Sequence, residues 1–113
     1  MTTQDQELNQ QLIQNPNEEN YPLEQPLQSG GTTITHVIVR KPNVKALSGV
    51  SLQAIYQHDV NALIKVLPRV TTPPLTAQQV MDLDPVDFAN LGGHLVTFLY
   101  PKALQQAIKE EQT

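Results

Sequence analysis

Residues 21–40 read YPLEQPLQSGGTTITHVIVR, and the predicted fold class follows from this segment. In its first part apolar residues alternate with polar residues and prolines, which is the pattern of a half-buried strand. Pro22 and Pro26 cannot donate hydrogen bonds to a neighbouring strand, so this strand should lie at the edge of a sheet. We predict that this edge supports self-association of the chain. The apolar residues that mark it are Tyr21, Leu23 and Leu27.

A tight turn and a second strand follow this edge strand. Residues 29–31 are Ser-Gly-Gly, and the glycines supply the positive φ angles that a hairpin turn requires. Residues 32–40 are rich in β-branched side chains, which favours a returning strand. A two-stranded hairpin is only marginally stable alone in water, so it must pack on helices or pair with strands of another subunit.

Short amphipathic helices are predicted after the hairpin, at about residues 43–48, 51–57, 59–67, 76–82 and 84–100. Side chains that can cap a helix stand at several of these starts, namely Ser51, Asp59, Thr76 and Asp84. Pro68 is expected to stop the helix at 59–67, because proline lacks the N–H group that the helix ladder uses. The predicted fold class is therefore α+β, with a small N-terminal β-hairpin followed by several short helices and with disordered tails at both ends.

The last predicted helix contains two adjacent glycines, Gly92 and Gly93. Each costs roughly 1 kcal/mol relative to alanine inside a helix, so the pair is expected to permit close approach of another backbone or to mark a kink. Asp87, near the start of the same helix, is expected to interact with the positive end of the helix dipole.

The length of 113 residues predicts one domain, which we place at residues 21–101. Residues 1–20 form a leader rich in Gln, Asn and Glu, with too few apolar residues to offset the entropy of ordering, and are expected to be disordered. Residues 102–113 are expected to form a polar, partly helical tail. The first 14 residues contain no basic residue and no apolar run, so no secretory signal and no membrane contact are predicted.

Catalysis, a cofactor and a bound metal are not predicted. His36, His58 and His94 do not share a spacing that would chelate a metal ion. The acidic residues in 82–87 lack the glycine and the closing glutamate of a calcium loop, and helix capping explains them better. The chain has no cysteine, and no serine or threonine lies in a nucleophile motif. With a net charge of −4 and sparse basic residues, nucleic-acid binding is not expected either.

Apolar binding surface is the most informative remaining feature. The predicted helices at 60–67 and 88–99 each bury one face, and we predict that together they form a groove for a partner protein. The residues that carry this prediction are Leu63, Ile64, Leu67, Leu95, Phe98 and Leu99. The alternative is that most of them form the core, because every small domain must bury its best apolar stripes.

Several short motifs occur in an order and spacing that resemble one known family. They are RKPN at 40–43, LSGVSL at 47–52, DVNALIKVLPR at 59–69, TTPPLT at 71–76, LDPVD at 83–87, LG at 91–92 and FL at 98–99. Over about residues 21–101 the chain resembles the tail assembly chaperones of contractile-tailed, Mu-like phages and prophages. The leader departs from the family pattern, and nothing is carried over to it.

The resemblance implies an α+β protein that binds the tape measure protein, keeps its hydrophobic helices soluble and assists tail tube assembly. It implies no catalytic residues. It also implies a location in the bacterial host cytoplasm, absence from the mature virion, contact with the tail tube protein, and a form of the chain extended by a programmed ribosomal frameshift. Two alternatives remain open, namely a structural minor tail component retained in the virion and a small regulatory binding protein that is not of phage origin.

Overall fold

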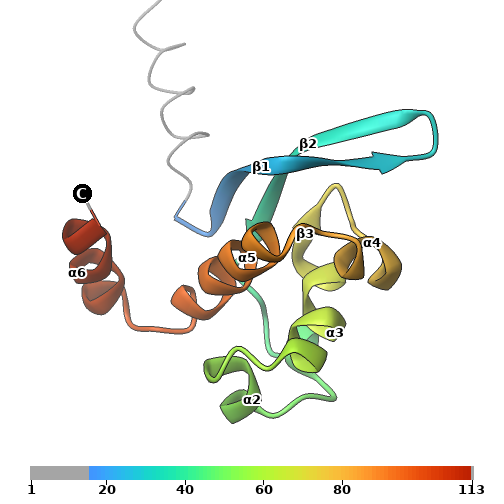
Figure 1. Ribbon diagram of the computed structural model, residues 1–113. Coiled ribbons are helices and arrows are strands. Elements are labelled where there is room, and N and C mark those ends of the chain that lie inside the picture. Colours follow the sequence, from blue (N-terminus) through green and yellow to red (C-terminus); the bar gives the residue numbers. More distant parts are fainter. Residues whose placement is uncertain (1–15, 113) are drawn as a thin grey trace, which may run out of the picture.

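The computed structural model describes residues 16–112 and has the predicted α+β architecture (Figure 1). A β-hairpin lies above a group of short helices, and a third, two-residue strand extends the sheet. The elements in chain order are β1 (Glu18–Ser29), β2 (Thr32–Arg40), the 3₁₀ helix η1 (Lys45–Leu47), α2 (Leu52–Tyr56), α3 (Val60–Val70), β3 (Thr71–Thr72), α4 (Ala77–Met81), α5 (Pro85–Thr97) and α6 (Lys102–Gln112).

The sheet is antiparallel, with the strands in the order β1, β2, β3. Gly30 adopts a φ of 61° in the turn, as the glycine pattern predicted. On the far side of β2, Val39 pairs with Thr71 and Ile38 with Thr72. β3 is thus a two-residue strand, and it ends directly before Pro73. β1 also begins at Glu18, three residues before the predicted start, because residues 18–20 pair with the end of β2.

A wide bulge interrupts β1. Pro22 pairs with His36, whereas the next paired residue, Leu27, faces Ile34. Five steps along β1 therefore match two steps along β2, and residues 23–26 bow out of the ladder. The bulge turns the N–H groups of Glu24 and Gln25 away from β2 and toward α5.

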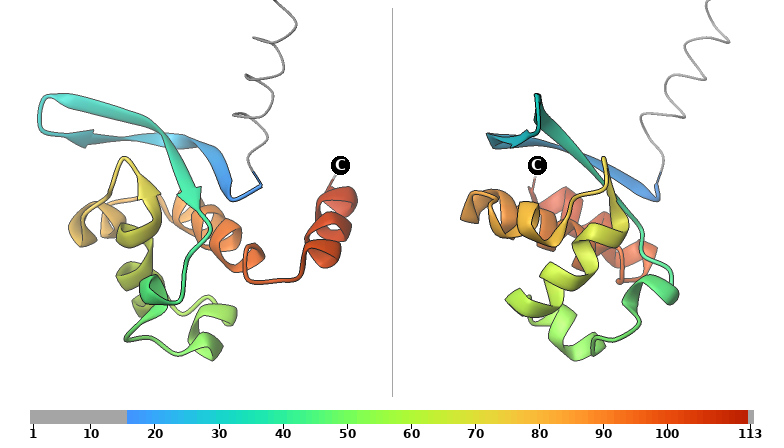
Figure 2. Two further views of the ribbon diagram at one scale, coloured as in Figure 1. Left: turned by 180° about the vertical axis from the view of Figure 1, so that it is seen from behind. Right: turned by 90° about the vertical axis from the view of Figure 1, so that its right-hand side faces the viewer.

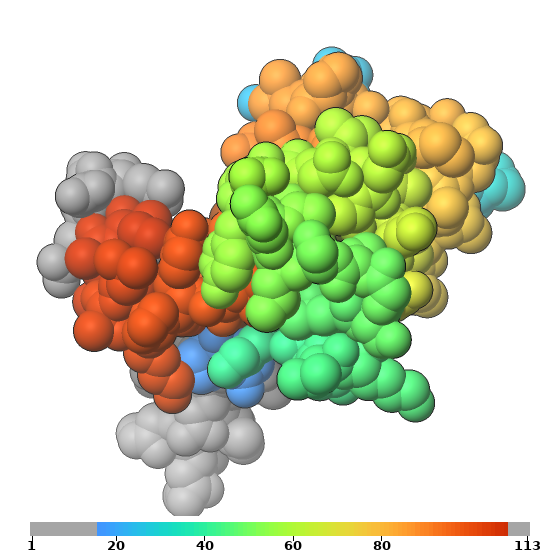
Figure 3. Space-filling model, turned by 90° about the horizontal axis from the view of Figure 1, so that it is seen from below, coloured from blue at the N-terminus to red at the C-terminus, as the bar shows by residue number. Residues whose placement is uncertain are grey.

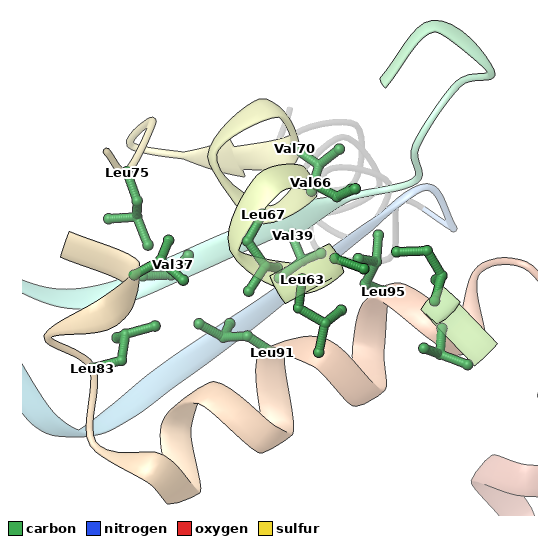
Figure 4. Close-up of a cluster of buried hydrophobic side chains, with 14 of the residues drawn as sticks. Val37, Val39, Leu63, Val66, Leu67, Val70, Leu75, Leu83, Leu91 and Leu95 are labelled. Carbon is green, nitrogen blue, oxygen red and sulfur yellow. The ribbon is translucent and has the colours of Figure 1, made fainter. Parts of the chain in front are cut away.

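The helices α3 and α5 cover one face of the hairpin and enclose an aliphatic core (Figures 1 and 2). Figure 4 shows the core side chains converging between the sheet, α3 and α5. Fully buried members from these elements are Val37, Val39, Leu63, Val66, Leu67, Leu91 and Leu95. Burial of one such side chain contributes roughly 1.5–3 kcal/mol, so this cluster is the main source of stability.

Pro68 does not end α3, contrary to the prediction from sequence. The helix continues to Val70, with Pro68 in its last turn. Only one helical hydrogen bond is lost so close to the end, while Val70 is 3% exposed in the core. The Thr71 hydroxyl donates to the carbonyl of Leu67 at 2.9 Å, which satisfies one of the terminal carbonyl groups.

The predicted last helix is shorter than expected, because α5 ends at Thr97. The Phe98 N–H still donates to the carbonyl of His94, after which Leu99 and Tyr100 form turns that lead to Pro101. α6 then stands apart from the other helices in Figure 1 and in the left-hand view of Figure 2. In the described part of the chain, no helix is both long enough and apolar enough to span a membrane.

The packing of Leu63 explains the glycine at position 92. A Cβ atom at this position would lie 2.8 Å from Cδ1 of Leu63, so the missing side chain lets Leu63 pack against α5. The close approach is made by a side chain rather than by a backbone. A Cβ atom added at Gly93 would meet no other atom within 4 Å, and α5 continues through both positions.

Candidate binding surfaces

The structure places the six predicted partner-binding residues in or against the core. Leu63, Leu67 and Leu95 are at most 1% exposed, and Phe98 is 8% exposed. Ile64 and Leu99 are partly buried and pack on the same cluster. The six residues therefore come together as expected, but four of them lie between elements and not on an open groove. Their contact with a partner stays a prediction, and it would require α3 and α5 to separate.

The predicted self-association edge is an edge in the structure as well, because β1 is the outer strand. Leu23 and Leu27 point into the core. Pro22 and Pro26 have no N–H group, and the N–H groups of Glu24 and Gln25 donate to the carboxylate of Asp87. The middle of β1 thus offers few donors to an added strand, a common protection of edge strands. Self-association through this edge stays a prediction.

A buried carboxylate joins the bulge to α5. Asp87 is fully buried, and its Oδ1 accepts hydrogen bonds from the Tyr21 hydroxyl and the Glu24 N–H, both at 2.8 Å. Its Oδ2 accepts from the Gln25 N–H at 3.0 Å. Asn90 donates to the Tyr21 hydroxyl at 2.9 Å. These five residues form one hydrogen-bonded network, which we call the Asp87 network.

The hydrogen bonds of this network set the acidity of both ionisable groups. Burial acts to raise the pKa of Asp87, but the N–H groups of Glu24 and Gln25 and the Tyr21 hydroxyl outweigh it, so the pKa lies below its ordinary value. Burial and the hydrogen bond to Asp87 raise the pKa of Tyr21. Asp87 is therefore a stable carboxylate at neutral pH. With all its hydrogen bonds directed at the protein itself, it holds the fold together rather than acting on a substrate.

The sequence did not reveal this role of Asp87, for which it predicted an interaction with the helix dipole. Asp87 does lie in the first turn of α5, where its charge is favourable. Its hydrogen bonds to Glu24 and Gln25 depend on the bulge in β1, more than 60 residues earlier in the chain. The alternating sequence pattern of β1 gives no sign of that bulge. The spacing of Pro22 and Pro26, with Glu24 and Gln25 between them, was the available signal.

An exposed aromatic patch lies where α2 meets the end of α5. The rings of Tyr56 and Tyr100 stack with their centroids 5.8 Å apart, and the Tyr56 hydroxyl donates to the carbonyl of Leu99 at 3.4 Å. Tyr56 remains 41% exposed, and Leu52, one turn earlier on α2, is 52% exposed. We call Leu52, Tyr56, Leu99 and Tyr100 the tyrosine patch. Figure 3, the view from below, shows α2 in green beside the end of α5 and α6 in red-orange.

Residues 16–112 offer few groups that could bind a metal ion or a small ligand. No group of three or more His, Asp or Glu residues there could hold a metal ion. A hollow lies between α6 and the start of the hairpin, and its lining is mostly polar. The lining residues are Pro16, Asn17, Lys41, Phe98, Lys102, Gln105 and Gln106. Together these features define a small α+β protein whose distinctive surfaces are exposed apolar patches.

Comparison with known proteins places this molecule in a family. The model of the family "Phage tail assembly chaperone proteins, E, or 41 or 14" matches residues 20–100. The chain therefore belongs to this family of phage tail assembly chaperones, which confirms the resemblance seen in the sequence. The role of the family is not a catalytic one.

Two proteins of Escherichia phage P2 are similar to this chain. Tail assembly protein E is 45% identical over 83 residues, which cover 74% of this chain and 91% of that protein. Tail assembly protein E′ is 46% identical over 77 residues, which cover 68% of this chain and 54% of E′. The chain thus spans nearly the whole of E but only about half the length of E′. No solved structure matches the chain.

Proposed function

We propose that this tail assembly chaperone binds the tape measure protein and keeps its apolar helices soluble while the tail tube assembles around it. Membership of the family carries the assembly role. The tyrosine patch supports the binding role, because it combines exposed apolar area with hydroxyl groups that can hydrogen-bond. The chain works in the cytoplasm of the bacterial host, meets the tail tube protein during assembly and is left out of the finished virion.

The tyrosine patch has the chemistry to receive one face of an apolar helix. Tyrosine offers a large contact area at a low cost in conformational entropy, since only two side-chain angles become fixed. Amphipathic helices bind such surfaces through residues at i, i+3, i+4 and i+7. One patch of this size binds weakly, and many copies along a long client supply the overall affinity.

We also propose that a longer form of this chain takes part in assembly. E and E′ of phage P2 both match the same domain, yet the match fills 91% of E and only 54% of E′. A form that shares the domain and carries an extension would bind the same client and add a second contact. A programmed ribosomal frameshift would produce both forms from one gene.

The proposal is tested by co-expression with the tape measure protein of the same phage. The wild-type chain should move the client into the soluble fraction and co-purify with it. The double variant Leu52→Ser, Tyr56→Ser should lose most of this effect. Val60→Ser is the matched control, because Val60 is 56% exposed but lies outside the patch.

Each outcome of this experiment is informative. If the wild-type chain leaves the client insoluble, the proposed function is wrong. If the client is solubilised equally well by the double variant, the function stands and the tyrosine patch is not its site. Mass spectrometry of purified virions would contradict the assembly role if the chain were present at a fixed stoichiometry.

A further inference from the structure

Charge is unevenly distributed along the chain. Between Glu24 and Asp82 the only acidic residue is Asp59, whose side chain caps α3. The same stretch contains all the basic residues of the central domain, namely Arg40, Lys41, Lys45, Lys65 and Arg69. Acidic residues instead gather in the loop between α4 and α5.

The basic residues meet where the end of β2, η1 and the end of α3 lie together. Arg40 donates from Nη2 to the carbonyl of Arg69 at 3.2 Å. Arg69 donates from Nη1 to the carbonyls of Ala46 at 2.9 Å and Ser48 at 2.7 Å. These bonds to carbonyl groups hold the two guanidinium groups in place. Glu18 lies opposite Arg40 in the strand register.

An exposed apolar residue lies among these charges. Val44, directly before η1, is 86% exposed and adjoins Lys45. Burial of such a side chain is favourable, and nothing in the described part of the chain covers it. We call Val44, Lys45, Arg40 and Arg69 the basic face.

A matching surface of opposite charge lies at the junction of α4 and α5. Met81 is 55% exposed and Val86 is 49% exposed, and Asp82 and Asp84 lie between them in the chain. Glu24 is held next to this junction, since its N–H group binds Asp87 in the first turn of α5. We call Met81, Val86, Asp82, Asp84 and Glu24 the acidic face.

The two faces lie on opposite sides of α3. Both α4 and η1 contact α3, and Figure 2 shows them on its two sides in the right-hand view. Each face has an exposed apolar centre and a charged rim, which is the usual arrangement of a protein interface. Each face carries charge of one sign, so it repels the same face of a second copy. When the basic face of one copy contacts the acidic face of another, each of the two copies keeps one face free for a further contact.

We propose that copies of this chain associate head to tail, with the basic face of one copy against the acidic face of the next. Such a contact is heterologous, so it builds a row of copies, which stays open unless its rotation closes a ring, and not a two-copy dimer. A row of this kind can grow along an elongated client. The contact is small, and therefore weak in dilute solution. It needs no client to form, so it can be tested on the chain alone.

The test uses charge reversal on each face, followed by mixing. One variant carries Lys45→Glu, and the other carries Asp82→Lys. Sedimentation velocity of the wild-type chain over a wide concentration range should show a mean mass that keeps rising and that falls when salt is added. Each reversal should weaken self-association about tenfold or more, because like charges then meet in every contact.

Mixing the two variants should restore association, since every contact between unlike copies again joins opposite charges. Val44→Ser provides an uncharged variant of the basic face and should also weaken association. Thermal unfolding followed by circular dichroism establishes that each variant is folded. A wild-type chain that stays monomeric at all concentrations would overturn the proposal. So would a dimer of fixed mass that neither reversal affects, which would point to the β1 edge instead, and so would a mixture that fails to associate.

Discussion

At the scale of single residues, Asp87 is the polar residue on which the join between hairpin and helices depends most. Its carboxylate accepts three hydrogen bonds from β1 and lies entirely inside the protein. A buried donor left without an acceptor costs roughly 1–3 kcal/mol, whereas a satisfied hydrogen bond contributes only about 1 kcal/mol. The network is therefore more costly to break than its individual bonds suggest.

We expect Asp87→Ala to lower the free energy of unfolding by about 3 kcal/mol or more, because it leaves the N–H groups of Glu24 and Gln25 without their acceptor. Asp87→Asn keeps one acceptor oxygen and should cost less. Asp82→Ala, at an exposed position, is the control and should change stability by less than about 0.5 kcal/mol. Urea unfolding measures all three. Equal effects of Asp87→Ala and Asp82→Ala would contradict this assignment.

The lowered pKa of Asp87 predicts a dependence of stability on pH. Because the folded-state pKa lies below the unfolded value of about 3.9, the carboxylate contributes its full stabilisation above that value. The contribution is lost as pH falls through the folded-state pKa. The difference in unfolding free energy between wild type and Asp87→Asn should therefore shrink on acidification below about pH 4. A difference that stays constant from neutral to acidic pH would be inconsistent with a charged Asp87.

The two glycines of α5 form a natural matched pair. Gly93→Ala should stabilise the protein by about 0.5–1 kcal/mol, because alanine is the better helix former and nothing obstructs its Cβ. Gly92→Ala gains the same propensity but forces Leu63 to move inside a packed core, which typically costs about 1–3 kcal/mol. Melting temperatures should thus rise for Gly93→Ala and be clearly lower for Gly92→Ala. Equal stabilisation by both would show that Leu63 adapts without cost.

At the scale of elements, local chemistry made most of the fold predictable. Ser51, Asp59, Thr76 and Asp84 cap the helices that the sequence assigned to them, and Thr76 and Gln79 form a complete capping box. The glycines of the hairpin turn lie where expected. Such signals act over a few residues, so they can be read without knowledge of the tertiary structure.

The features that the sequence did not predict all depend on contacts between distant segments. The bulge in β1 exists because Asp87 accepts its N–H groups, and β3 exists because β2 has a free edge beside the end of α3. α3 continues beyond Pro68 because Val70 is buried in the core. The six predicted partner-binding residues were chosen for their apolar pattern, which is the same for core and for binding surface.

Removal of the Tyr21 hydroxyl tests how the hairpin is held on α5. Tyr21→Phe loses the bond to Asp87 and the bond from Asn90, and we expect a cost of about 1–2 kcal/mol. The loss should loosen β1 locally, so hydrogen exchange at the amides of Glu24 and Gln25 should speed up more than at β2. Uniform acceleration over the whole chain would mean that the network does not hold the hairpin separately.

At the scale of the whole molecule, the domain combines a well-packed aliphatic core with three surfaces that carry exposed apolar side chains. The tyrosine patch, the basic face and the acidic face share no residue, so variants can test client binding and self-association separately. A small chaperone with these surfaces could coat a long client in successive copies. The tyrosine patch is the site at which we propose that the client binds.

The most direct measurement is light scattering during dilution of denatured tape measure protein into buffer that contains the purified chain. Wild type should suppress client aggregation in proportion to its concentration, and Val60→Ser should act like wild type. The Leu52→Ser, Tyr56→Ser variant should suppress it only weakly at the same concentration. Client aggregation at an unchanged rate in an excess of folded wild-type chain would contradict the proposed client-binding role.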